Sequence, residues 1–528
     1  MTKRTLSLFA TILCLAACLA AVPAAAAPST EKTITYSWPL NAGDINPHLY
    51  SPNQMYAQAL VYEPLVSFGD SGKIEPCLAV SWAISDDGKA YTFTLRDGVT
   101  FSDGTPFDAA AAKKNFDTIM ANAKRHSWLA IVELIEKTEA VDPKIFRLTL
   151  KTPYAPTLND LSLIRPFRFL SPKAFPESGN TADGIRATVG TGPWVLAETK
   201  KGEYDVFVRN ENYWGPRPFF DKIVVRVLPD PEGRVVAFET GEIDLIYGSQ
   251  INIESFMRLK GSGQYATAVS GPMTTRAFAI NSARGATKDL GVRRAIQHAV
   301  NRDAIVRSIF RDLEPRADFL FPTTTAYCDT GATPYEYDPA KAAKLLDDAG
   351  WKKVAGRDYR EKDGKNLSME VCFVGNDPLQ KALAEVIQGD FRKVGIEAVL
   401  IGEERDSFYG RQKTGEFDLI FSQTWGAPYE PHAVVGSMRA PSHADYQAQV
   451  GLPMKKDLDA SITKVLSATD EAERAKLYRE ILTTLHEQAV YLPLTYPTQL
   501  AVYSKKIADF PFSVLQYVVP FERMSERK

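Results

Sequence analysis

The feature that most constrains the fold is an alternation of helix and strand patterns in the second half of the chain. The patterns follow one another as helix 338–349, strand 368–374, helix 379–394, strand 396–402 and strand 417–422. Gly350 follows the first of these helices, at the position where glycine commonly ends a helix. Strands that alternate with helices form an open sheet covered by helices, so we expect an α/β fold here.

The remainder of the chain combines short strand patterns with a few helices. Strand-like stretches occur at residues 33–38, 79–107, 138–150, 222–228 and 491–502. Helices are predicted at residues 109–121, after the capping residue Asp108, at Arg293 to about Phe310, and at Thr469 to about Ala489. The first half is therefore expected to be richer in β-structure than the second.

The length of 528 residues is too great for one ordinary core, so two or more domains are expected. No internal repeat, low-complexity segment or Pro/Ser-rich linker separates the parts. Domains joined without a linker tend to share crossing strands and a cleft. We expect the crossings, which would act as a hinge, near residues 270–282 and 488–500.

The N-terminal residues have the pattern of a secretory signal peptide. Lys3 and Arg4 precede an apolar segment that runs from Leu6 to about Ala21, and the small residues Ala24 to Ala27 follow. This order predicts cleavage near Ala26, so that residues 1–26 are removed on export. No later apolar run approaches the ~20 residues of a membrane span. The mature chain is expected to be soluble in the periplasm.

The cysteines leave two questions open. Leu15 to Cys18 also fits a lipid-attachment pattern, so a lipid-anchored form is an alternative to free export. Cys77, Cys328 and Cys372 remain in the mature chain and allow at most one intrachain disulfide. The formal net charge of −2 gives no basic stripe, which argues against nucleic acid as a partner.

Enzyme motifs are missing from the sequence. The chain contains no phosphate loop of the GxxxxGK[ST] type and no GxSxG elbow. His486 and Glu487 begin like a zinc-protease helix, but Val490 occupies the position of the second histidine. We therefore predict that the protein is not an enzyme.

The stretch from Phe417 to Asp445 is the best candidate for a ligand site. An apolar strand ends near Phe421, and a Gly/Pro-rich loop with Trp425, Tyr429, His432 and His443 follows. In open α/β domains, ligands bind beyond the carboxyl ends of the strands. Two of the six histidines therefore lie where a small molecule is expected.

Several blocks of the sequence resemble the extracytoplasmic solute-binding proteins of ABC transporters in the peptide/nickel class, family 5. These blocks are Leu78 to Trp82 with Asp87-Gly88, Tyr91 to Arg96, Gly190 to Trp194, Asn212 to Trp214, Arg294 to Arg302 and Asp338 to Trp351. Further segments are similar to the nickel-binding members of that class: residues 46–55, 125–129, 165–169, 204–215, 424–433 and 441–445. The resemblance spans nearly the whole mature chain.

The resemblance implies a two-lobed α/β fold with a ligand cleft between the lobes. It divides the chain into lobe I at 27–274, with an inserted peripheral domain at about 66–190, lobe II at 275–497, and a C-terminal segment, 498–528, that returns to lobe I. It also implies a monomer that delivers its ligand to the permease of an ABC importer, which an ATPase drives.

The same resemblance implies roles for individual residues. His443 matches a histidine that binds nickel directly, and Arg165 matches an arginine that faces the carboxylates of a nickel-bound chelator. The residues that match pocket-lining positions are Tyr50, Met55, Trp128, Trp425 and Tyr429. Tyr517 stands where the family has a small hydroxyl residue, which would alter one wall of the pocket and change which chelator fits.

The chemistry of nickel(II) agrees with such a site. Imidazole nitrogen and carboxylate oxygen suit nickel(II), but none of the six histidines forms an HxH or HxxxH pair. The sequence therefore favours capture of a preformed chelate with a small carboxylate- or histidine-type molecule. A guanidinium can pair with its carboxylates, and aromatic rings can exclude water.

Alternatives remain open for the residues and for the cargo. His432 is either a second ligand or a residue that orders the loop by hydrogen bonding, and His48 is either structural or a ligand. Without the resemblance, Arg165 could form a surface ion pair, and the aromatic residues could belong to the core. The alternative cargoes are a short peptide, an opine-type metallophore or haem, and the third hypothesis is an exported enzyme.

Overall fold

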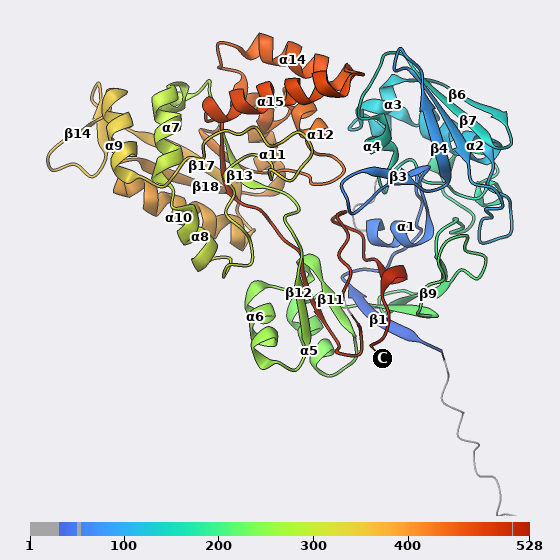
Figure 1. Ribbon diagram of the computed structural model, residues 1–528. Coiled ribbons are helices and arrows are strands. Elements are labelled where there is room, and N and C mark those ends of the chain that lie inside the picture. Colours follow the sequence, from blue (N-terminus) through green and yellow to red (C-terminus); the bar gives the residue numbers. More distant parts are fainter. Residues whose placement is uncertain (1–30, 50–53, 509, 528) are drawn as a thin grey trace, which may run out of the picture.

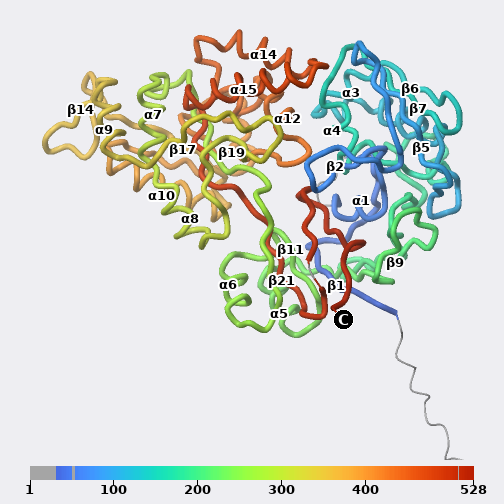
Figure 2. The backbone as a smooth tube through the Cα atoms, in the orientation of Figure 1, coloured from blue at the N-terminus to red at the C-terminus, as the bar shows by residue number. Residues whose placement is uncertain are grey.

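Two lobes stand side by side in the computed structural model, which describes residues 31–49, 54–508 and 510–527 (Figure 1). We name residues 31–269 and 500–527 the N-terminal lobe and residues 276–495 the C-terminal lobe. Two short links, residues 270–275 and 496–499, join them. The smooth trace in Figure 2 shows the links in the middle of the molecule, between the green strands below and the C-terminal lobe.

The base of the N-terminal lobe is a four-stranded sheet in the order β1-β10-β9-β8. Its strands are β1 (Thr33–Trp38), β10 (Lys222–Val227), β9 (Tyr204–Arg209) and β8 (Trp194–Lys200). β1 pairs in parallel with β10, and the other pairs are antiparallel. Helix α1 (Met55–Val61) packs on this sheet with six of its seven side chains buried, as its apolar sequence predicts.

A second sheet, the peripheral sheet, has the order β4-β5-β7-β6. Its strands are β4 (Ala79–Ile84), β5 (Ala90–Leu95), β7 (Ile145–Leu150) and β6 (Ile135–Asp142), and its helices are α2 (Ala109–Ala121), α3 (Ala130–Leu134) and α4 (Thr157–Leu161). Along β5, Tyr91, Phe93 and Leu95 are buried and alternate with half-buried residues, as expected for a strand with one face on the core. The hairpin β2 (Val66–Phe68) and β3 (Ile74–Pro76) leads into this sheet.

The C-terminal lobe has a five-stranded sheet in the order β18-β17-β19-β13-β20. Its strands are β18 (Glu397–Glu403), β17 (Ser368–Val374), β19 (Leu419–Gln423), β13 (Arg276–Ile280) and β20 (Tyr491–Thr495). β17 runs parallel to β18 and β19, whereas β13 is antiparallel to β19 and β20. The prediction of an open α/β sheet is confirmed for this lobe.

Helices surround this sheet (Figure 1). They are α7 (Leu290–Ala299), α8 (Arg302–Ser308), α9 (Pro339–Asp348), α10 (Pro378–Lys393), α11 (Arg405–Thr414), α12 (His432–Ser437), α13 (Ala444–Gln449), α14 (Lys455–Ser467) and α15 (Glu471–Glu487). A small sheet of β14 (Lys352–Lys353), β15 (Arg360–Lys362) and β16 (Lys365–Asn366) extends from the lobe beside α9. The Asp470 carboxylate caps α15 by accepting a hydrogen bond from the Glu473 amide at 2.7 Å.

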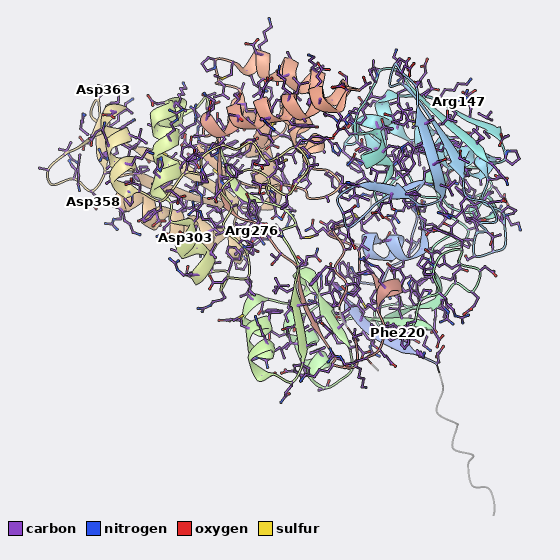
Figure 3. The ribbon with its side chains drawn as sticks, in the orientation of Figure 1. Arg147, Phe220, Arg276, Asp303, Asp358 and Asp363 are labelled. Carbon is purple, nitrogen blue, oxygen red and sulfur yellow. The ribbon has the colours of Figure 1, made fainter. Side chains whose placement is uncertain are left out.

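The two links run antiparallel to each other. They connect the C-terminal lobe to a three-stranded sheet of β11 (Leu245–Tyr247), β21 (Leu500–Tyr503) and β12 (Ala266–Val269), which α5 (Pro231–Glu239) and α6 (Ile253–Ser262) cover. The Ser270 amide donates to the Gln499 carbonyl at 2.9 Å, and the Met273 amide donates to the Pro497 carbonyl at 2.8 Å. Arg276, labelled in Figure 3, begins the C-terminal lobe and forms an ion pair with Glu314 at 3.0 Å.

The prediction of one long helix from Arg293 to about Phe310 is wrong. The segment from Arg293 to Phe310 forms two helices, α7 and α8, because Asn301 interrupts the pattern. Its side chain accepts a hydrogen bond from the Ala304 amide at 2.9 Å, which is the geometry of an N-cap. A periodic apolar pattern does not reveal that a short polar residue within it starts a new helix.

The buried apolar side chains form three clusters, and their boundaries differ from those of the two lobes. One hydrophobic cluster fills the base of the N-terminal lobe around Trp194 and Phe207, and a small one lies around Phe238 and Phe256. The largest cluster is continuous from the peripheral sheet into the C-terminal lobe.

Cys77, Cys328 and Cys372 are buried free thiols. Over the described residues, the helices are all too short or too polar to cross a bilayer.

Candidate functional site

A small, partly open hollow lies between the two lobes. The N-terminal lobe contributes one set of lining residues: Met55, Leu163, Ile164, Leu515, Gln516 and Tyr517. The C-terminal lobe contributes Trp425, Ala427, Pro428 and Tyr429. A hollow with walls from both lobes is the kind of concave, largely apolar site that small ligands occupy, and we call it the interlobe pocket.

The C-terminal wall of the pocket is a loop that follows β19. Hydrogen bonds between Thr275 and Thr424 tie its start to the link: the Thr424 amide donates to the Thr275 carbonyl at 3.0 Å, and the Thr275 amide donates to Thr424 Oγ1 at 2.8 Å. Gly426 has a φ of +73°, and a Cβ there would lie 2.7 Å from the Met273 carbonyl oxygen. Only glycine combines that backbone conformation with so close an approach.

A buried carboxylate holds the middle of this loop. Oε1 of Glu430 accepts a 2.6 Å hydrogen bond from the Gly426 amide. Burial raises the pKa of Glu430 to about 7, while hydrogen bonds from the Thr424 hydroxyl and from the Gly426 and Trp425 amides oppose the rise. The loop therefore depends on an acid that titrates near neutral pH.

Two rings of the C-terminal lobe line the pocket, and the ring of His443 lies beside one of them. Trp425 and Tyr429 pack edge to face with their centroids 6.3 Å apart, and the ring of His443 lies 6.1 Å from that of Trp425. His443 is half-buried and directly precedes α13. Trp425 is 37% exposed although it lies beside the pocket, so its indole is available for contact with a ligand.

The residue that anchors the histidine segment is Asp445. Its carboxylate is buried and accepts hydrogen bonds from Ser437 Oγ at 2.8 Å and from the Tyr491 hydroxyl at 2.9 Å. Burial raises the pKa of Asp445, whereas the two hydroxyls and the nearby His443 oppose the rise. These bonds fix the first turn of α13 to β20 and so fix the position of the His443 backbone.

On the opposite wall, Arg165 directly follows the pocket residues Leu163 and Ile164. It is 6% exposed, and its guanidinium carbon lies 5.6 Å from the centroid of the Trp128 ring. Trp128 is 40% exposed. A guanidinium over an indole face is a cation–π arrangement, which fixes the direction of the charged group.

Most of the residues singled out from the sequence therefore gather around the interlobe pocket. Met55, Trp425, Tyr429 and Tyr517 line it directly, and His443 lies against Trp425. Arg165 and Trp128 contact each other next to the N-terminal wall. Tyr50 lies outside the described residues.

Sequence reasoning missed the apolar and amide members of the walls. Leu163, Ile164, Ala427, Pro428, Leu515 and Gln516 line the pocket but carry no chemical signal of their own. Each is adjacent in sequence to a residue that was singled out or to another lining residue. A search that included the sequence neighbours of each predicted site residue would have found them.

Two further histidines have structural partners. Nε2 of His432 lies 3.1 Å from Oδ1 of Asp160 in the other lobe, which favours the interpretation that it orders the loop. His48 is buried between the Thr181 hydroxyl at 3.0 Å and the Arg168 carbonyl at 3.1 Å, and burial lowers its pKa to about 3. Over the described residues, no three His, Cys, Asp or Glu side chains are grouped so that they could hold a metal ion.

Comparison with known proteins agrees with this architecture. Residues 73–446 match the model for bacterial extracellular solute-binding proteins, family 5. The nickel-binding periplasmic protein of Escherichia coli K12 is 47% identical over 520 residues, which cover 98% of each chain.

Two solved structures place the fold. NikA from Brucella suis, in complex with Fe(III)-EDTA, is 52% identical, with a TM-score of 0.91 over 94% of this chain and all of that one. NikZ from Campylobacter jejuni, in complex with Ni(L-His), is 26% identical, with a TM-score of 0.74 over 95% of this chain and all of that one. With its two lobes and the pocket between them, this chain belongs to the bacterial extracellular solute-binding proteins of family 5.

Proposed function

We propose that this protein is the solute-binding component of an ABC importer and that it captures nickel(II) as a small-molecule chelate. The observation that carries the proposal is the interlobe pocket, because the ring of His443 lies 6.1 Å from that of the lining residue Trp425 and Arg165 follows the lining residue Ile164 on the opposite wall. The imidazole would complete the coordination of the nickel, and the guanidinium would pair with carboxylates of the chelator.

The pocket walls suit a chelate better than a bare ion. Trp425, Tyr429, Met55 and Tyr517 present apolar surface to the hollow, and such surface binds the organic shell of a ligand and excludes water. Relatives bind metals in this form: NikZ is in complex with Ni(L-His) and NikA from Brucella suis with Fe(III)-EDTA. A small carboxylate- or histidine-type molecule is the chelator we propose here.

The same assignment predicts how the chain is divided into lobes and where the mature protein acts. Lobe I would comprise residues 27–274 with the inserted domain at about 66–190, lobe II residues 275–497, and residues 498–528 would return to lobe I. The continuity of the core at the base of the N-terminal lobe, which includes Tyr503 and Phe521, supports that return. We further propose that residues 1–26 are removed on export and that the mature monomer delivers its ligand to a membrane permease without modifying it.

Calorimetry on metal-stripped protein tests the proposal. Nickel chloride alone, nickel with L-histidine and nickel with citrate are titrated separately into the wild type, His443→Ala and Arg165→Ala. We expect binding of one nickel chelate, a loss in His443→Ala whatever the chelator, and a larger loss in Arg165→Ala for the more carboxylate-rich chelate. His298→Gln is the matched control, because His298 is buried in the C-terminal lobe and contacts the Glu336 carbonyl rather than the pocket.

Two results would overturn the assignment. Tight uptake of nickel chloride alone, unchanged in both variants, would place the metal elsewhere. Recovery of a chemically altered chelator after incubation would point to an enzyme.

A further inference from the structure

The two lobes meet at a second place, away from the links. Helix α4 of the N-terminal lobe faces α12 of the C-terminal lobe in the upper part of Figure 1, whereas the links lie in the lower middle. The backbone amide of Ala155 donates to the Leu466 carbonyl at 2.8 Å, and Asn159 Nδ2 donates to the Pro428 carbonyl at 3.4 Å. We call this region the closure contact.

The closure contact and the links flank the interlobe pocket. Pro428 is a pocket residue, and His432 begins α12 three residues after the pocket residue Tyr429. On the other lobe, Asp160 lies in α4 three residues before the pocket residue Leu163. Parting of the closure contact about the links would therefore open the pocket.

One buried pair of polar side chains, with a member from each lobe, lies in the closure contact. Nε2 of His432 is 3.1 Å from Oδ1 of Asp160, and these residues are 5% and 1% exposed. Burial and the neighbouring Asp160 carboxylate raise the pKa of Tyr154, so this tyrosine also faces Asp160 from its own lobe. Apolar residues of one continuous cluster surround the pair, among them Leu161 and Val434.

The energetics of such a pair depend on whether the lobes are together. In the closed arrangement each group is buried and has the other as its partner, whereas separation of the lobes returns both to water. Removing one partner leaves a buried polar or charged group uncompensated, which disfavours the closed arrangement strongly. Replacing both by apolar residues removes that penalty.

We propose that Asp160 and His432 form an interlobe latch that sets how much of the protein is closed, both without ligand and with it. The latch would change the affinity for the ligand by changing the fraction of protein molecules that are closed. If the ligand binds to the closed form, its apparent affinity is proportional to that fraction. His432 is thus a positioning residue, and the metal is left to His443. The effect on affinity rests on the proposed function, but the effect on closure does not.

The test measures the distance between the lobes directly. Glu136 on β6 and Lys456 on α14 are exposed, so Glu136→Cys and Lys456→Cys provide one spin label on each lobe, while the native cysteines stay buried. Pulsed electron paramagnetic resonance gives the distance distribution of the ligand-free protein. The variants are His432→Leu, Asp160→Leu, the double variant and the conservative Asp160→Asn.

The two single leucine variants should shift the ligand-free distribution to longer distances and weaken binding of the nickel–histidine chelate by at least about tenfold, mainly through faster dissociation. The double variant and Asp160→Asn should recover most of the closed population. His298→Leu is the control for a buried histidine that spans no interface, and it should lower the melting temperature without changing the distance.

Three outcomes would overturn the latch. They are single variants with the wild-type distance distribution, a double variant that is no more closed than the single ones, and a ligand-free wild type with no closed population. Because the distances are measured without nickel, a protein that fails to bind the chelate but still opens in the single variants would refute the proposed function and leave the latch standing.

Discussion

The amide of Gly426 donates a 2.6 Å hydrogen bond to the buried carboxylate of Glu430, and this contact folds the pocket loop back on itself. It joins the residue after Trp425 to the residue after Tyr429, so it sets the spacing of the two rings that line the C-terminal wall. The shape of that wall therefore depends on one backbone conformation and one carboxylate, and both can be changed separately.

Gly426→Ala should damage the loop. The substitution places a Cβ 2.7 Å from the Met273 carbonyl at a φ of +73°, so we expect a loss of about 1–3 kcal/mol in the free energy of unfolding, measured by urea denaturation. Chelate affinity should fall as well. Gly389→Ala, in α10 with open space around the Cβ position, should instead be neutral or stabilising. Equal effects at both glycines would contradict this account of the loop.

Glu430→Gln should change how stability depends on pH. The pKa of Glu430 rises from 4.5 to about 7 on folding, so its contribution to stability is fully present below pH 4.5 and is lost as the pH rises through 7. That loss is about 3 kcal/mol, and the glutamine variant should lack it. The measurement is the free energy of unfolding of both proteins from pH 4.5 to 7.5. Parallel curves would show that Glu430 does not titrate in this range.

Tyr517→Ser tests the wall of the pocket that the N-terminal lobe contributes. Tyr517 lines the hollow and is 42% exposed, and removing its ring should cost about 1 kcal/mol of binding for a small chelate, or about fivefold in affinity. The relative preference should move toward bulkier chelates, as measured by calorimetry with nickel–histidine and nickel–EDTA. Tyr409→Ser, on α11 and outside the pocket lining, is the control with a similarly exposed ring. A loss of the same size in both variants would remove Tyr517 from the site.

Asn301→Ala tests the break between α7 and α8. The Asn301 side chain accepts a hydrogen bond from the Ala304 amide, and losing this cap should cost about 1 kcal/mol of unfolding free energy. Asn301→Asp keeps an acceptor at the cap and should retain most of the stability. Chelate affinity should stay unchanged in both variants, because Asn301 does not line the pocket.

Local elements were predictable where one physical signal dominated. The strand at 33–38 and the helix at 109–121 were found with their bounds, because alternation in the first and the Asp108 cap in the second leave little choice. The break at Asn301 was missed, because an apolar period continues across it. The role of His432 was left open, because its partner Asp160 is 272 residues away in the sequence.

The sequence by itself determined the α/β character of the second half, the position of the ring-bearing loop after a strand, and which residue types could bind a metal chelate. These are local properties, set by periodicity, turn chemistry and the donor atoms of each side chain. Only the tertiary structure decided that Met55, Ile164, Trp425 and Tyr517 share one hollow, and that His432 faces Asp160. Those contacts join segments hundreds of residues apart, and burial of a common apolar surface, which no local pattern encodes, brings them together.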